Sequence, residues 1–191
     1  MVRFVSSFEF ITVLYAVIVG LAIAHLLTGL GRAIHHRASA PLWWVHLGWT
    51  IAIFSYITLN WWTLFYLSKE TTWTYLSFLY LLIHAVMMFL LAVLHYPPEP
   101  EGSPDYRVIF ATNRPWLLGT FSASFVIDIG ATALQGNLWN PWFYLPVVLH
   151  LALLLGVGAV YSAIRYQQFL AVYVPAFILG WGVVVRGILA D

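Results

Sequence analysis

The stretch from residue 78 to residue 94, FLYLLIHAVMMFLLAVL, contains no charged residue and one histidine, His84. With its flanks, the same apolar segment extends over residues 73–96. About 20 predominantly apolar residues suffice to cross the hydrocarbon core of a bilayer as a helix. The stretch therefore predicts a transmembrane helix.

Segments of the same character lie on both sides of this one. The expected spans are residues 8–31, 42–67, 73–96, 115–135, 142–163 and 167–189. The breaks between them carry the Pro, Gly, Asn or charged residues typical of polar connections, and the longest, residues 97–114, is acidic and Pro-rich. Short breaks between the last three spans predict antiparallel neighbours. We therefore expect an all-α fold, a polytopic membrane bundle of about six helices forming a single domain over residues 1–191.

The composition supports this class and excludes others. Of the 191 residues, 62% are hydrophobic and 8% charged, with a mean hydropathy of +0.88 and a net charge of +1. Soluble domains are about half apolar and about a quarter charged. The weak net charge excludes nucleic acid as a partner, and the absence of cysteine excludes thiolate catalysis and Cys-ligated metals. The partner we expect is the lipid bilayer of a plasma membrane or bacterial inner membrane, with a homo-oligomer or a larger membrane complex left open.

The orientation follows from the basic residues in the expected loops. One side carries five and the other three: Arg32, Arg37, Arg107, Arg114 and Arg165 against Arg3, Lys69 and Arg186. The positive-inside rule then places both termini outside the cytoplasm. Although residues 38–40 have the A-x-A form of a cleavage site, the preceding apolar run exceeds the core of a signal peptide, so we expect it to remain as a span.

Tryptophan is abundant, and most of the ten residues fall at expected helix ends, as in the aromatic belts of membrane proteins. Trp49 and Trp181 lie deeper than a belt residue, and we attribute both to packing.

Ionisable residues inside expected spans are the candidates for function, because each costs about 2.5–3.5 kcal/mol to insert. We expect an intramembrane polar or transport site that contains Asp128, His150, His84, Arg186 and Ser124. A carboxylate at this depth has to be neutral, paired or in a wet cavity. Arg186 and His150 are the candidate partners of Asp128, and a purely structural Asp–Arg pair explains the same residues.

A second inner-leaflet cluster is expected from His25, His46, His95 and Arg32, near the cytoplasmic edge. The division between the first and last three spans resembles an inverted 3+3 arrangement. Three histidines suggest a metal, but no H-x-x-x-H or E-x-x-H spacing occurs on any expected helix, so we predict no metal site.

Haem b is a further alternative. His84 and His95 share one helix face about 16 Å apart along the axis. Bis-His ligation would pair His150 with His84, and His25 or His46 with His95. Because such coincidences arise easily among seven histidines, we expect no cofactor.

The function that these residues favour is transport or channel activity for protons, small ions or small solutes, in a protein that forms oligomers. A non-catalytic subunit or assembly factor of a larger membrane complex is the alternative, and a haem b electron carrier the next. Phosphate-binding and hydrolase motifs are absent from the sequence. We therefore expect a protein that is not an enzyme.

Overall fold

The computed structural model describes residues 7–67, 73–98, 105–134, 139 and 142–189. Within these residues the chain forms six helices and no strand. The helices are α1 (Ser7–His35), α2 (Trp44–Leu67), α3 (Tyr75–His95), α4 (Tyr106–Leu134), α5 (Tyr144–Val160) and α6 (Ile164–Leu189). The expected all-α fold is confirmed.

Most of the helices have the length and the composition of membrane spans. Four of them, α1, α3, α4 and α6, are long and apolar enough to cross a membrane, and α5 is a shorter apolar helix of 17 residues. The outer face of α1 exposes Phe10, Val13, Val17 and Leu21. A helix that faced water would carry polar groups on that side. These are the properties of a multi-pass integral membrane bundle.

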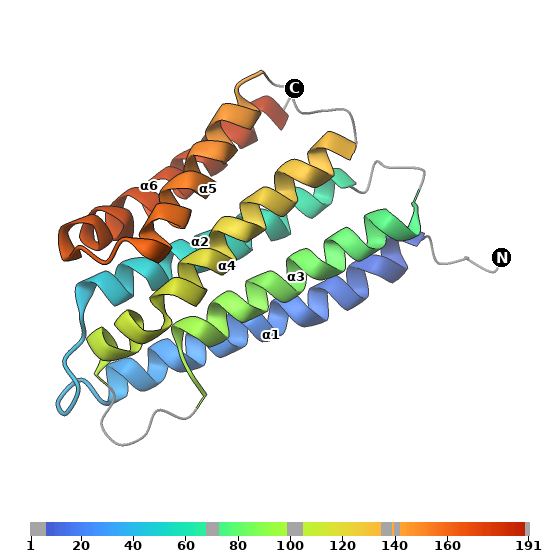
Figure 1. Cartoon of the computed structure of the whole chain (residues 1–191). Helices are drawn as coiled ribbons and strands as arrows, with labels where there is room; N and C mark the ends of the chain where they lie inside the picture. The colour runs from blue at the N-terminus through green and yellow to red at the C-terminus, as the bar shows by residue number, and fades with distance from the viewer. Residues whose placement is uncertain (1–6, 68–72, 99–104, 135–138, 140–141, 190–191) are drawn as a thin grey trace.

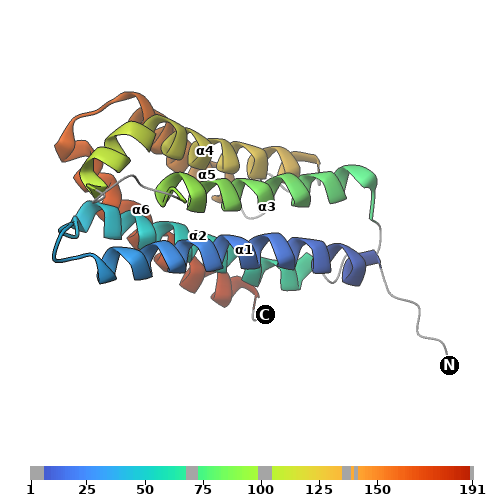
Figure 2. The ribbon, with the colours of Figure 1, turned by 90° about the horizontal axis from the view of Figure 1, so that it is seen from below.

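The helices lie in two layers that run along a common direction. Figure 2 shows α3, α4 and α5 along one side and α1, α2 and α6 along the other. Figure 1 shows that α1, α3 and α5 run one way and that α2, α4 and α6 run the opposite way. The closest pairs are α4 with α5, α1 with α3, α2 with α6 and α3 with α4. As expected, α4 and α5 are antiparallel neighbours.

One helix boundary differs strongly from expectation. α4 begins at Tyr106 rather than near residue 115, so the second half of the expected loop 97–114 is helical. Asp105 caps this helix, because its Oδ1 accepts a hydrogen bond of 2.8 Å from the backbone N–H of Arg107. Pro115 lies inside α4 rather than at its start. Proline fixes a helical φ and removes one backbone hydrogen bond, which a long helix tolerates as a local bend.

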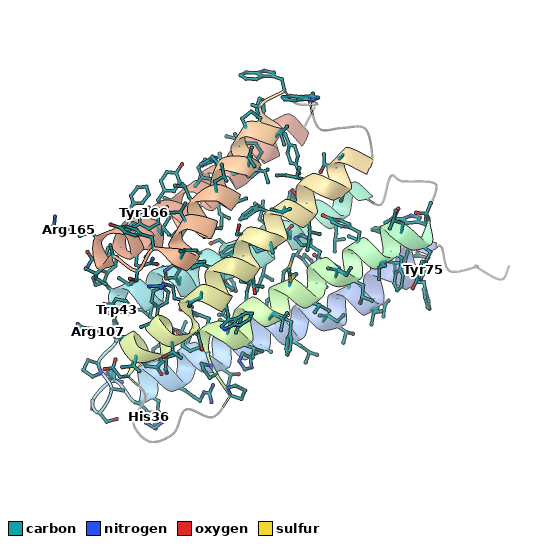
Figure 3. The ribbon with its side chains drawn as sticks, in the orientation of Figure 1. His36, Trp43, Tyr75, Arg107, Arg165 and Tyr166 are labelled. Carbon is teal, nitrogen blue, oxygen red and sulfur yellow. The ribbon has the colours of Figure 1, made fainter. Side chains whose placement is uncertain are left out.

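Basic side chains gather at one end of the bundle. Figure 3 shows His36, Arg107 and Arg165 at the end where α1 finishes and α2 begins, whereas Tyr75 lies at the other end of α3. Arg165 belongs to the first turn of α6 rather than to a separate turn. We call this end the basic end. It is the side on which the sequence places five of the basic residues.

α2 is the central element, because it contacts α1, α3, α4 and α6. Among the described side chains, seven polar ones are buried, and α2 supplies three of them: His46, Thr50 and Ser55. Its contact with α6 depends on Gly48, where an added Cβ would lie 2.5 Å from the backbone oxygen of Ala171. A glycine at this position lets the two backbones approach closely.

We expect Gly48→Ala to lower the unfolding midpoint of the detergent-solubilised protein. The added methyl forces α2 and α6 apart, and such overpacking costs about 1–3 kcal/mol. Gly180→Ala on α6 is the matched control, because nothing lies within 4 Å of a Cβ there. Thermal unfolding followed by tryptophan fluorescence measures both. Equal midpoints for the two variants would contradict the close contact.

Candidate functional site

Asp128 lies on α4 and is held by tyrosines from two other helices. The Tyr80 hydroxyl of α3 donates to Oδ1 at 3.1 Å, and the Tyr144 hydroxyl of α5 donates to Oδ2 at 2.5 Å. Hydrogen bonds to an acid are among the stronger ones in proteins, and in an apolar bundle they replace water as the partner of the carboxyl group. The two donors therefore fix Asp128 between α3 and α5.

A second hydrogen-bonded chain lies beside Asp128. Tyr56 of α2 contacts His84 Nε2 at 2.8 Å and donates its proton to Ser124 Oγ at 3.0 Å, and Ser124 donates to the Phe121 carbonyl at 2.7 Å. A phenol has one proton, so the His84 Nε2–H has to be the donor to Tyr56. The Tyr80 and His84 rings stack with centroids 5.7 Å apart. The chain thus joins α2, α3 and α4 next to the carboxyl group.

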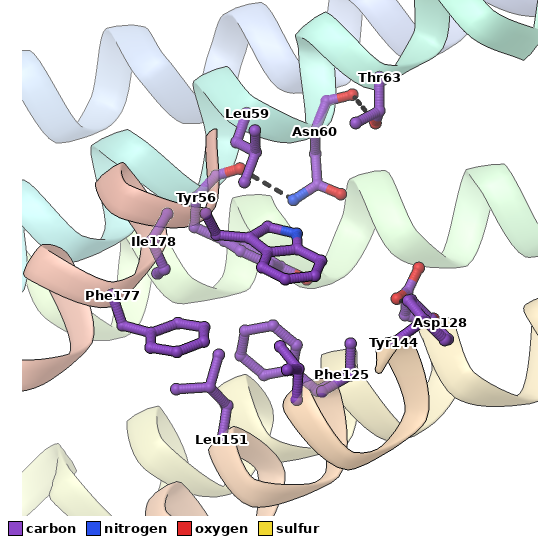
Figure 4. A pocket seen from close by; sticks show the side chains of 13 residues that line it. Tyr56, Leu59, Asn60, Thr63, Phe125, Asp128, Tyr144, Leu151, Phe177 and Ile178 are labelled. Carbon is purple, nitrogen blue, oxygen red and sulfur yellow. Dashed lines mark hydrogen bonds between the residues drawn. The ribbon is translucent and has the colours of Figure 1, made fainter. Parts of the chain in front are cut away.

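Two pockets meet at Asp128. The larger, of about 300 Å³, lies between α2, α4, α5 and α6, and its lining includes Tyr56, Asn60 and Asp128 (Figure 4). The smaller, of about 160 Å³, is lined by Asn60, Tyr80, His84 and Asp128 among others. A water needs about 10–15 Å³ of such volume, so both pockets are large enough for several. Among the residues that the structure describes, Asp128 is the one acid that lines either pocket.

A second polar cluster lies nearer the basic end. The rings of His46 on α2 and His95 on α3 stack, with centroids 3.8 Å apart and an angle of 16° between planes. Thr50 Oγ1 donates to the His46 carbonyl at 3.0 Å, and its oxygen accepts from His95 Nε2 at 2.9 Å and from the Tyr96 hydroxyl at 3.0 Å. His95 therefore carries its proton on Nε2.

This histidine pair is almost completely buried and incompletely hydrogen-bonded. His46 is 2% exposed and His95 1% exposed. Neither ring nitrogen of His46 has a hydrogen-bond partner among the described atoms, and His95 Nδ1 has none. Buried polar atoms without partners are rare in proteins, because each costs about 1–3 kcal/mol. The pair is held by stacking and by Thr50 rather than by a complete network.

The other members of the predicted inner cluster bind the segment after α3. His25 Nε2 contacts the Tyr96 carbonyl at 2.6 Å, and Arg32 donates to the Pro98 carbonyl at 2.5 Å and to the Pro97 carbonyl at 3.2 Å. Gly29, between them on α1, has the Tyr96 ring against its Cα. His25 and Arg32 thus anchor this segment and do not touch the histidine pair directly.

Among the described side chains, the hydrogen-bond partner of His150 is a tyrosine of α6 and not Asp128. His150 Nε2 contacts the Tyr173 hydroxyl of α6 at 2.9 Å, and its ring packs on Phe177. Arg186 lies in α6, but its side chain is outside the described part of the chain. Of the expected group, Asp128, His84 and Ser124 come together around the smaller pocket and the Tyr56 chain. The Asp128 cluster draws on α2, α3, α4 and α5 and so joins the two halves of the chain, whereas the His46–His95 cluster draws on α2 and α3 in the first half.

The described histidines that were considered as haem or metal ligands have other partners in the structure. A bis-His haem holds the porphyrin between two imidazoles, whereas the His46 and His95 rings are in face-to-face contact. His84 and His150 bind tyrosines on different helices. In the described ranges, no group of three or more His, Asp or Glu side chains is placed to hold a metal ion.

Sequence reasoning missed the tyrosines and an amide. Tyr80 precedes His84 by four residues, and Tyr56 precedes Asn60 by the same interval. Residues four apart share a helix face, so these spacings placed both tyrosines beside polar residues deep in their spans. The belt interpretation covered the tryptophans, and the tyrosines within the spans were not considered as hydrogen-bond partners.

The fold and the polar network define a class, an all-helical membrane bundle with a half-buried, hydrogen-bonded acid between its helices. Comparison with known proteins adds no family, because no family model, no curated protein and no solved structure matches the chain.

We expect Tyr56→Phe to destabilise the protein by about 1–3 kcal/mol, because His84 Nε2 and Ser124 lose their shared partner in a buried site. Tyr75→Phe removes a hydroxyl from a side chain that is 77% exposed and serves as the control. Urea or thermal unfolding in detergent compares the two. A midpoint for Tyr56→Phe equal to that of Tyr75→Phe would show that this chain contributes nothing to stability.

For the histidine pair we expect opposite outcomes from the same substitution. His46→Phe keeps the stacked ring and removes two unpartnered nitrogens, so the unfolding midpoint stays or rises. His95→Phe breaks the bond to Thr50 and lowers stability by about 1 kcal/mol. Thermal unfolding of the two variants in one detergent tests the difference. Equal losses in both would contradict the assignment of hydrogen bonds.

Proposed function

We propose that this chain is a small membrane transporter that moves protons through the bundle past Asp128 and His84. The observation that carries the proposal is the position of Asp128. This acid lies between the helices of an apolar bundle, and its side chain lines two pockets. Ionisable residues inside membrane proteins commonly mark ion pathways and proton relays. A structural role alone does not require space on both sides of the carboxyl group.

The neighbouring groups are suited to proton transfer. The smaller pocket has Asp128, Tyr80 and His84 in its wall, and waters there would bridge the carboxyl group to the imidazole. From His84 the hydrogen bonds continue to Tyr56 and Ser124. Carboxyl, imidazole and hydroxyl groups in hydrogen-bond contact can pass protons from one to the next.

In the proposal, an apolar layer lies between this route and the His46–His95 pair. We assign Ile53, Met88 and Phe121 to it, and each of them is fully buried. On α2 the layer extends from Tyr56 to Thr50, which is about 9 Å at the helical rise per residue. In our proposal this layer closes the route in the described state, and transport requires it to admit water.

The environment that we propose is a plasma membrane or bacterial inner membrane, with both termini outside the cytoplasm. The clustering of His36, Arg107 and Arg165 at the basic end supports this orientation, since cytoplasmic loops carry an excess of Lys and Arg. Oligomer formation is part of the same proposal and is measured by native mass of the purified protein.

Proton uptake into proteoliposomes tests the function. The vesicles contain a pH-sensitive dye, and a potassium gradient with valinomycin makes the interior negative. We expect the wild-type chain to admit protons, and Asp128→Asn to reduce the rate by about tenfold or more, because no other acid lines the pockets.

Asp105→Asn is the matched control, because Asp105 is an exposed acid whose capping role Asn retains. Its rate should equal that of the wild type. Wild-type uptake no faster than that of protein-free vesicles, or equal uptake by wild type and Asp128→Asn, would reject the proposal.

A further inference from the structure

The larger pocket has an aromatic wall that a proton pathway does not require. Five rings from four helices line it: Tyr56, Phe125, Tyr144, Phe177 and Trp181. Figure 4 shows Phe125 and Phe177 facing the same space as Tyr56, with Asp128 at one side. The rest of the lining is mainly Leu, Val and Ile, with two further polar side chains, Asn60 and Thr63.

The charge of the pocket comes from one group. Among the described side chains, Asp128 has hydroxyl partners, from Tyr80 and Tyr144, and no basic partner. No described Lys, Arg or His lines the larger pocket. An acid in an apolar site binds a cation strongly, because little water competes for it. The faces of aromatic rings attract cations in the same way.

These features select among kinds of ligand. A divalent metal ion prefers six or more oxygen ligands, and a wall made mainly of rings and aliphatic groups does not provide them. An anion would meet Asp128 without a described basic residue. A neutral apolar molecule would leave the carboxyl group with its two hydroxyl partners but without a partner of opposite charge. A cation with apolar substituents satisfies the carboxyl group, the rings and the aliphatic wall together.

We infer that the larger pocket binds an organic ammonium cation, with its charged centre between Asp128 and the aromatic rings and its alkyl groups against the aliphatic wall. The inference rests on the proposed transport function, because the inference names the chemical class of a solute that this transporter would carry at the Asp128 site. The volume of about 300 Å³ lies at the lower end of the range for small-molecule pockets, about 300–1,000 Å³, which suits a small ammonium compound.

Equilibrium binding to the purified full chain in detergent tests this inference. The probe is radiolabelled tetraethylammonium, and the competitors are choline and its uncharged isostere 3,3-dimethyl-1-butanol. We expect one saturable site per chain, displaced by choline and not by the neutral alcohol. Equal displacement by both competitors, or no saturable binding, overturns the inference.

Variants locate the probe in the pocket. We expect Asp128→Asn to weaken binding by about tenfold or more, and Trp181→Leu by about tenfold, since a cation over an aromatic ring in a desolvated site gains that much. Asp105→Asn and Trp142→Leu are the matched controls, and both should bind as the wild type does. Trp142 is 74% exposed and lies outside the pocket lining. Unchanged binding of the probe in both pocket variants overturns the inference. If Asp128→Asn does not fold, the binding measured with Trp181→Leu alone decides whether the inference holds.

Arg186→Gln tests whether the chain itself supplies the cation. We expect this variant to bind the probe as the wild type does. Binding that appears only after Arg186→Gln would overturn the inference, because an arginine of α6 would then occupy the site. Proton uptake without cation binding rejects the inference and leaves the proposed function standing. Stoichiometric cation binding without proton uptake rejects the function and leaves the binding site standing.

Discussion

A polar side chain inside this bundle has to find its partners within the protein, on its own helix backbone or on another helix, because neither lipid nor the apolar core supplies one. This constraint organises the interior. Asp128 on α4 takes its donors from α3 and α5, and Tyr56 on α2 connects α3 with α4. Dispersion forces between apolar helices are poorly directional. The hydrogen bonds therefore specify which helix faces meet, while the aliphatic and aromatic residues fill the space between them.

The fold followed from the sequence because long apolar runs allow few structures in a membrane. The start of α4 was missed for a local reason. Pro115 resembles a helix start, and the stretch before it is polar enough to be taken for a loop. The actual start depends on a cap at Asp105, and a capping side chain is hard to distinguish from an ordinary loop residue in a polar segment.

The candidate site was predictable in its rare residues and not in its common ones. Asp128 and His84 stand out because ionisable groups are scarce in spans, and Ser124 was found through its spacing from Asp128. The tyrosines that bind them were hidden among eleven in the chain. That His150 bonds to Tyr173 rather than to Asp128 depends on how α5 turns toward α6. Rotation of a helix about its axis is set by packing against neighbours, which one sequence does not reveal.

The position of α2 has a mechanical consequence. Thr50, near its start, belongs to the His46–His95 cluster, and Tyr56, less than two turns later, belongs to the chain beside Asp128. A helix turns about its axis as a stiff body, so a rotation of α2 that breaks one set of bonds strains the other at the same moment. Because α2 contributes to both polar clusters, a rotation of this helix as a stiff body would change the two clusters together.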